Sequence, residues 1–301
     1  MNRRDFLRIG TGALASNLLS IGRVHGAPIE PSVFEVEGRT ADAMAALFAA
    51  VGGVDSLVEK DLSRATVLIK PNLCLPHAEA SGTTTSPQAV DALCSFLASK
   101  GAKRIVIADH TLKSNRFDKI ELNAVVAEYP NARLLLANQQ RLYEPLDVDG
   151  RVLKQIELLK VVRRADLFIN LATAKHHSAT RVSLAIKNLM GVIWDRTTFH
   201  TRLDLSQAIA DLATAVRPSL NIVDASRVLL SGGPTGPGTV VRENRLFAGL
   251  DILALDAVVA SRYGFGGRRL PPEQIEHLKA SHKNGVGEID TRKIRVEKVE
   301  A

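Results

Sequence analysis

The sequence predicts an α/β fold, a mostly parallel β-sheet with helices on both faces, of the Rossmann-like, doubly wound kind. Short runs rich in Val, Ile and Leu alternate with longer stretches of helical periodicity. These runs are apolar throughout, which is typical of strands that are buried on both faces of a sheet. No internal repeat and no linker-like segment interrupts the alternation, so residues 28–301 are expected to form a single domain.

The clearest helix start lies at Ser86. Its hydroxyl can cap the first turn, Pro87 suits the first helical position, and Gly101 suits the helix end. The other elements are expected as strands at 66–70, 104–109, 132–138, 165–171 and 220–225, and as helices at about 117–128, 180–193 and 204–216.

Two further segments have extended character. Residues 147–156 indicate a pair of extended segments joined by a turn at Asp149-Gly150. The chain becomes more polar from about residue 268, and residues 293–300 within this C-terminal tail are typical of an edge strand.

The first 27 residues have the layout of a secretory signal. A charged start is followed by an uncharged run at 9–21 and by small residues at Gly26 and Ala27. The pair Arg3-Arg4 resembles a twin-arginine export signal. We therefore expect the twin-arginine export machinery as a partner, a periplasmic location, and no stable membrane insertion after cleavage. The alternative is a basic N-terminal helix.

Composition argues against nucleic-acid binding. Aromatic residues make up only 4% of the chain, too few to provide the stacking surfaces of a single-strand binder. The net charge is +7, but four arginines and one aspartate in the first 26 residues supply +3 of it. The remaining excess is spread along the chain without a Lys/Arg block, so no nucleic-acid partner is expected.

The two cysteines limit the redox chemistry. Cys74 and Cys94 do not form a CxxC pair, so this chain alone cannot hold an iron–sulfur cluster on four thiolates. Helical spacing predicts that Cys94 is buried packing. An oxidising compartment permits a Cys74–Cys94 disulfide, but the expected strand-end and mid-helix positions rarely give the required geometry.

Polar residues follow the predicted strands where each strand ends. In sheets of this kind, ligands bind at the carboxyl ends of the strands. The residues there are Lys70-Pro71-Asn72, Asp109-His110, Lys175-His176-His177, and Asp224 with the following Gly/Pro-rich loop at 231–238. This convergence predicts a binding site at one edge of the sheet.

The segment 175–191, KHHSATRVSLAIKNLMG, adds polar groups next to an apolar run. If it is helical, Lys187 lies on a polar stripe with Thr180 and Ser183, where it could reach an anion bound near the helix N-terminus. The alternative is a solvated helix flank on which Lys187 extends into water.

Histidines and aspartates offer proton carriers or metal ligands. His177 and His200 are candidates for both roles, and Asp109 and Asp224 could orient them or complete a site for zinc, nickel or iron. No HExxH-like spacing supports a metal directly. Asp256 lies in an apolar helical pattern and therefore must cap, pair or hold a lysine.

The loop at 231–238, SGGPTGPG, is a second candidate for anion contact. Gly232 and Gly233 would let backbone amides approach an anion, although a plain long turn is the alternative. The chain has no Walker sequence, no dinucleotide fingerprint and no GxSxG, so a nucleophile-elbow hydrolase is disfavoured.

Several segments together resemble a known family. In order, they are VLIKPNL, TTTSPQAVDAL, GAKRIVIAD, KHHSATRVSLAIKNLMG, RTTFH, IADL, IVDA, GGPTGPG and AGLDILALDAVV. From about Val67 to Val259 the chain is similar to the DUF362 family, a domain of unknown function. The resemblance implies that the recurring polar positions are Lys70, Asn72, Asp109, Lys175, His177, Lys187, Asn188, His200, Asp224 and Asp256.

The chain departs from the family pattern at two points. Some members carry a ferredoxin-like cysteine segment, which is absent here, so direct electron transfer through a cluster is not implied. The usual Pro-Lys-Leu-Lys-Thr-His is Ala172-Thr173-Ala174-Lys175-His176-His177 in this chain, with one lysine fewer.

Two functions remain open, with a structural or interaction domain as a third option. In the first, an exported protein binds an anionic ligand or a metal cofactor and possesses redox activity; His177, Lys187 and His200 would be catalytic, and Lys70, Asn72, Lys175, Asn188, Gly232 and Gly233 would bind the ligand. The metal set would be Asp109, His177, His200 and Asp224. In the second, the same residues belong to a non-catalytic accessory protein that serves a redox partner.

Overall fold

The computed structural model describes residues 31–75, 77–112 and 121–301. The expected export signal at 1–27 and the start of the helix expected at 117–128 lie outside these residues. Within them, no helix is both long enough and apolar enough to cross a lipid bilayer.

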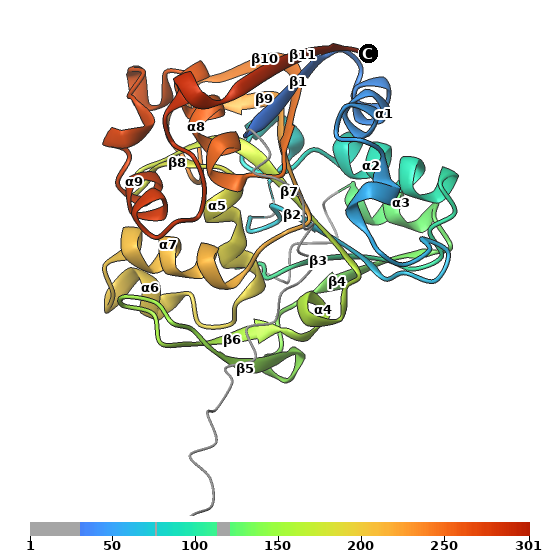
Figure 1. The fold of residues 1–301 in the computed structure, drawn as a ribbon, viewed down its shortest axis with the longest axis horizontal. Helices are drawn as coiled ribbons and strands as arrows, with labels where there is room; N and C mark the ends of the chain where they lie inside the picture. Colours follow the sequence, from blue (N-terminus) through green and yellow to red (C-terminus); the bar gives the residue numbers. More distant parts are fainter. Residues whose placement is uncertain (1–30, 76, 113–120) are drawn as a thin grey trace, which may run out of the picture.

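The centre of the fold is a parallel sheet, as predicted. Five strands lie in the order β9-β7-β2-β3-β4, and every neighbouring pair among them is parallel (Figure 1). Their bounds are Val67–Pro71 for β2, Ile105–Asp109 for β3, Ala132–Leu136 for β4, Leu167–His177 for β7 and Leu220–Leu229 for β9. The carboxyl ends of these strands therefore meet at one edge of the sheet.

The rest of the sheet includes antiparallel strands that the sequence analysis did not predict. These are β1 (Ser32–Glu37), β10 (Val240–Gly249) and β8 (Arg181–Ser183). β10 pairs antiparallel with both β9 and β1, and β8 pairs antiparallel with the end of β7. β11 (Arg295–Glu300) forms the edge beside β1, which confirms the edge strand expected in the C-terminal tail.

A separate two-stranded sheet contains the predicted extended pair, but its strands lie mostly outside the predicted bounds of 147–156. β5 (Tyr143–Asp147) and β6 (Gln155–Leu159) are antiparallel, with the residues between them forming the turn. Short helices α4 (Lys160–Arg164) and α6 (Thr197–Thr201) lie near this end of the molecule (Figure 1).

Helices cover both faces of the main sheet. On one face are α1 (Thr40–Ala50), α2 (Pro87–Ser99) and α3 (Leu122–Ala127); on the other are α5 (Ala185–Asn188), α7 (Leu205–Ala215), α8 (Ile252–Arg262) and α9 (Glu276–Lys283) (Figure 1). The strand β2 shows why two cores form. Leu68 joins one apolar cluster and Ile69 the other, because successive side chains of a strand point to opposite faces.

The helix start at Ser86 is confirmed. The Ser86 hydroxyl accepts a hydrogen bond from the amide of Ala89, and Pro87 is the first residue of α2. Gly101, just beyond the helix, has the positive φ of +88° that favours glycine. Cys94 is buried on this helix, as its spacing predicted.

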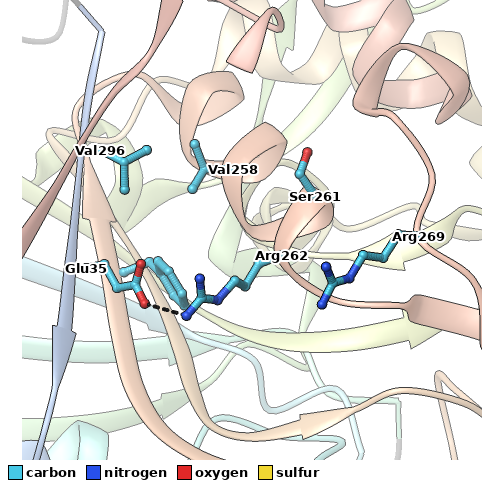
Figure 2. Close-up of a pocket in the computed structure, with 7 residues that line it drawn as sticks. Glu35, Val258, Ser261, Arg262, Arg269 and Val296 are labelled. Carbon is cyan, nitrogen blue, oxygen red and sulfur yellow. Dashed lines mark hydrogen bonds and ion pairs between the residues drawn. The ribbon is translucent and has the colours of Figure 1, made fainter. Parts of the chain in front are cut away.

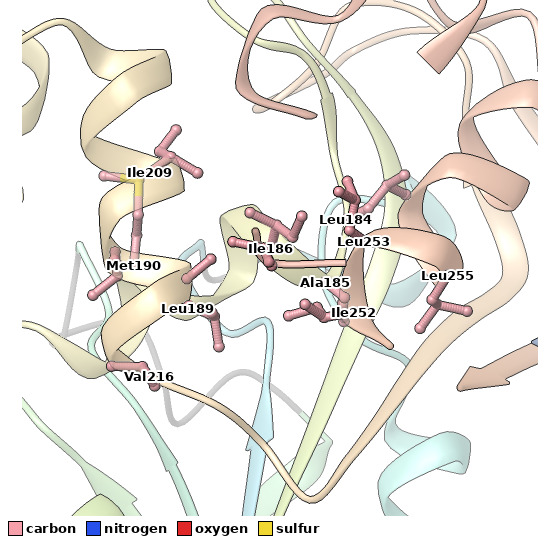
Figure 3. Close-up of a cluster of buried hydrophobic side chains, with 14 of the residues drawn as sticks. Leu184, Ala185, Ile186, Leu189, Met190, Ile209, Val216, Ile252, Leu253 and Leu255 are labelled. Atoms are coloured by element: carbon pink, nitrogen blue, oxygen red, sulfur yellow. The ribbon is translucent and has the colours of Figure 1, made fainter. Parts of the chain in front are cut away.

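The helix predicted at 180–193 is wrong in its first part. Residues Arg181–Ser183 form β8, and only Ala185–Asn188 are α-helical, followed by a 3-10 turn at Leu189–Val192. Thr180, Ser183 and Lys187 are all buried, so the alternative of a solvated helix flank is wrong. The segment is apolar on several sides because it packs between α7 and α8, with Ile186 lying between the two (Figure 3).

Asp256 caps this short helix from α8. Its two carboxylate oxygens accept hydrogen bonds from the amides of Ala185 and Ile186, at 2.8 and 2.9 Å. A protein carboxylate thus uses the amides that a ligand anion would need, so the expected anion contact at this helix N-terminus is wrong. Burial raises the pKa of Asp256 to about 7, although the two amide hydrogen bonds lower it.

Candidate functional site

The structure brings six of the predicted site residues together at the carboxyl edge of the sheet. They come from the ends of β2, β3 and β7 and from α5, and all are buried: Lys70, Asn72, Asp109, Lys175, Lys187 and Asn188. We call Lys70, Lys175 and Lys187 the lysine cluster. Burying three ammonium groups is costly unless each finds a partner, so their partners decide what the site can do.

Lys70 is fully paired within the protein. Its Nζ lies 2.8 Å from Oδ1 of Asp109 and donates to the carbonyl of Pro71 and to Oδ1 of Asn188, at 2.6 and 3.0 Å. The ammonium group therefore has two hydrogen bonds and one ion pair, all to groups of the protein itself. Burial lowers the pKa of Lys70, and the adjacent Asp109 opposes this shift.

A row of buried asparagines supports the lysines. Oδ1 of Asn188 accepts from Lys70 and from Asn72, and Nδ2 of Asn188 donates to Oδ1 of Asn170. Asn170 in turn donates to Asn221 on β9. These bonds fix the positions of the amides, so Asn72 and Asn188 orient the lysine cluster.

Lys175 is partly paired. Its Nζ donates to the carbonyl of Thr83 at 2.6 Å and to Oδ1 of Asn72 at 3.1 Å. Both acceptors are neutral, and one N–H remains beyond these two bonds. Burial is the main cause that lowers the pKa of Lys175 to about 8, and the charge of Lys70 adds to the effect.

Lys187 is the exception in the lysine cluster. Its side chain is 8% exposed, yet among the described residues its only hydrogen-bond acceptor is Sδ of Met190, at 3.4 Å. A thioether sulfur is a weak acceptor. Burial, and then the charge of Lys175, lower the pKa of Lys187 to about 8.

The histidines surround Lys187 at different depths. His177 is half-buried and His200 is exposed. Burial is the main cause that lowers the pKa of His177 to about 2, with the charges of Lys187 and Lys175 next. His177 is therefore neutral. Its Nδ1 accepts from the amide of Ala179, which assigns the ring proton to Nε2 and makes that nitrogen a donor.

His277 on α9 belongs to this group and was missed by the sequence analysis. Its side chain is fully buried, and neither ring nitrogen has a hydrogen-bond partner among the described residues. Burial, and then the charge of Lys187, lower its pKa to about 3. The residue lies in the tail that appeared merely polar, and no motif in the sequence singles it out.

Cys74 and Arg196 also lie beside the lysine cluster. Cys74 raises the pKa of all three lysines, which places its side chain near each of them. Arg196 lies 3.8 Å from Sγ of Cys74 and donates to the carbonyl of His110. Both residues are half-buried. The thiols of Cys74 and Cys94 are free, so the structure does not contain the permitted disulfide.

The four residues predicted as metal ligands are not brought together. The carboxylate of Asp109 binds Lys70 and the amide of Leu73, and that of Asp224 accepts from the amides of Ser86 and Ser226. Across the described ranges, no group of three or more His, Cys, Asp or Glu side chains is arranged to hold a metal ion. His177 and His200 lie near Lys187 instead.

The glycine loop at 231–238 is a structural turn between β9 and β10. The amide of Gly233 donates to Nδ1 of His176, and its carbonyl accepts from Ser178. Gly232 has a φ of +69°. These contacts pack the loop against the end of β7 on the side of His176, so the structure does not place Gly232 and Gly233 against the lysine cluster.

Gly191 is a second residue that the sequence analysis missed. A Cβ atom at this position would overlap the carboxylate of Asp109 and crowd the ammonium of Lys70. Only glycine leaves room for the ion pair, which makes Gly191 a packing requirement of the site. Gly191 is the last residue of the segment 175–191, but only the structure shows why glycine is needed there.

A surface hollow of about 340 Å³ lies elsewhere, between β1, β10, β11 and α8 (Figure 2). Its carboxylate, Glu35, is already paired with Arg245 and Arg262, at 2.6 and 3.1 Å. None of the residues that line this hollow belongs to the lysine cluster or its neighbours. We therefore place the candidate site at the lysine cluster.

Comparison with known proteins relates the chain to a protein family and to one named protein. The model of a family described as "Domain of unknown function (DUF362)" matches residues 67–261. The chain is also similar to a thylakoid-associated protein of Synechocystis sp.; the two are 22% identical over 236 residues, which cover 73% of this chain and 68% of that protein.

We predict that His277 makes folding sensitive to acid. Its pKa is about 3 in the folded protein against 6.5 ordinarily, so the unfolded chain takes up a proton first as the pH falls through 6.5. The free energy of unfolding should therefore decrease with falling pH in this window. Urea unfolding of His277→Leu should show a smaller decrease than the native protein.

The matched control is His282→Gln, because His282 is exposed on the same helix. Its pH dependence should equal that of the native protein. If His277→Leu also retains the full native pH dependence, His277 is not the buried neutral group that the structure indicates.

Proposed function

The chain belongs to the DUF362 family, and we propose that this protein binds a small anion at the lysine cluster. The observation that carries the proposal is Lys187. Its ammonium group is buried without an oxygen acceptor among the described residues, so a bound anion would supply the missing partner.

The charges around Lys187 support the same assignment. Arg196, Lys175 and Lys187 are cationic groups near one another, and the carboxylate of Asp109 is already paired with Lys70. An anion would receive charge-assisted hydrogen bonds from these groups, which are stronger than neutral ones. The neutral ring of His177 adds a donor at Nε2.

The donor set favours an anion over a metal ion. Cations at this site would repel a metal ion, and the predicted carboxylate ligands Asp109 and Asp224 are bonded elsewhere. The exposed His200 and half-buried Cys74 and Arg196 form the outer side of the group, where a small ligand would enter. His177 then serves as a neutral hydrogen-bond donor, and the exposed His200 is the candidate for a proton carrier.

We further propose that the protein is exported through the twin-arginine pathway. The support is the sequence layout of residues 1–27, above all Arg3-Arg4. Replacing both arginines by lysine should keep the full-length precursor inside the cell, as immunoblots of periplasmic and cytoplasmic fractions would show. Normal processing of that variant would contradict the proposal.

For anion binding, two probes are suitable: phosphate, and the small carboxylate 2-hydroxybutyrate. We predict that Lys187→Met weakens the affinity for either anion by about 10- to 100-fold, which is the loss expected when one hydrogen bond to a charged group is removed. Isothermal titration calorimetry measures this directly. Affinity of the native protein should fall as the pH rises through about 8, because Lys187 and Lys175 then lose their charge.

The control is Lys279→Met, which removes a half-exposed lysine on α9. Its affinity should match the native value. Failure of the native protein to bind either anion, or an equal affinity in Lys187→Met and Lys279→Met, would show that the lysine cluster is not an anion site.

A further inference from the structure

Lys187 has the properties of a nucleophile as well as those of an anion-binding group. We propose that Nζ of Lys187 forms an imine with the carbonyl carbon of a 2-oxo acid whose carboxylate is bound by the same group of cations. This inference rests on the proposed function, because it requires that the site bind the carboxylate.

The hydrogen bonds of the three lysines single out Lys187. A nucleophilic amine needs its lone pair, and a lysine held by oxygen acceptors is kept as ammonium. Lys70 has three oxygen acceptors and Lys175 has two, whereas Lys187 has only the sulfur of Met190 among the described residues. Lys187 can therefore lose a proton without breaking a hydrogen bond to oxygen.

The surroundings of Lys187 favour the neutral amine. It is buried on α5. The groups that act on its environment are Lys175 and His177 on β7, Cys74 after β2, Arg196 directly before α6, His200 on α6 and His277 on α9. Lys175 and Arg196 carry positive charge, and the histidines have lowered pKa values, whereas Cys74 acts in the opposite direction on the pKa of Lys187. With a pKa of about 8, about one Lys187 in ten is neutral at pH 7.

Burial next to another cation is a known way to activate a lysine for this chemistry. The neutral Nζ attacks the carbonyl carbon, a C–N bond forms, and the carbonyl oxygen takes a proton to give a carbinolamine. Loss of water then breaks the C–O bond and leaves the imine. Amine and ketone give imine and water, so no oxidant or reductant is required.

Other groups of the site fit the remaining parts of a 2-oxo acid. The unused N–H of Lys175 and the guanidinium of Arg196 are donors for the carboxylate. The Nε2–H of His177 is a donor for the carbonyl oxygen, and it remains neutral because of its lowered pKa. A simple inorganic anion would bind to the cationic groups, but it has no carbonyl carbon that Lys187 could attack.

The test is reductive trapping. The full-length protein is incubated with 2-oxobutyrate and sodium cyanoborohydride, and the reduced adduct is located by intact mass and peptide mapping. We expect one adduct, at Lys187, whose rate of formation rises with pH up to about 8 as the amine becomes neutral. Lys187→Arg keeps the positive charge but cannot form an imine, and it should give no adduct at this position.

Lys279→Arg, on the exposed side of α9, should trap at Lys187 as fast as the native protein. Binding of 2-hydroxybutyrate, which has no carbonyl to attack, separates the two claims. If 2-hydroxybutyrate binds but 2-oxobutyrate is not trapped, or is trapped equally on many surface lysines, the imine proposal is wrong and the anion site stands. If neither compound binds, both proposals fail.

Discussion

The free energy cost of burying lysine ammonium groups governs the arrangement of this edge of the sheet. Lys70 is stabilised by Asp109 and two neutral acceptors, and Gly191 leaves the space that this ion pair needs. Lys175 depends on neutral oxygens alone. Lys187 has neither a carboxylate nor an oxygen acceptor among the described residues, although it is almost as buried as Lys70 and Lys175. This difference makes the lysine cluster a candidate for ligand binding and chemistry.

The fold places these groups by simple rules. Parallel strands bring Lys70, Asp109 and Lys175 to one edge, and α5 adds Lys187 because Asp256 of α8 holds the start of that helix inside the protein. The C-terminal part of the chain adds His277, which is fully buried on α9. Segments separated by some 200 residues thus contribute to one environment, which is why the charges act on one another.

The central strands and the convergence of polar residues at one edge of the sheet could be predicted, because continuous apolar runs followed by polar residues are visible in the sequence. The antiparallel strands β1 and β10 have mixed patterns, and residues 180–193 fit a helical period although Val182 lies in β8. The separate roles of the lysines could not be predicted. They depend on backbone carbonyls, such as those of Pro71 and Thr83, and on the distant His277.

The central claim is that Lys187 is buried, has no oxygen acceptor among the described residues, and can bind an anion. NMR titration of selectively carbon-labelled lysines, with the Lys187 signal assigned by its loss in Lys187→Arg, tests it directly. The account predicts a pKa of about 8 for Lys187, and a higher pKa once phosphate is bound, because a bound anion favours the ammonium form. A pKa near the ordinary 10.5, unaffected by phosphate, would contradict it.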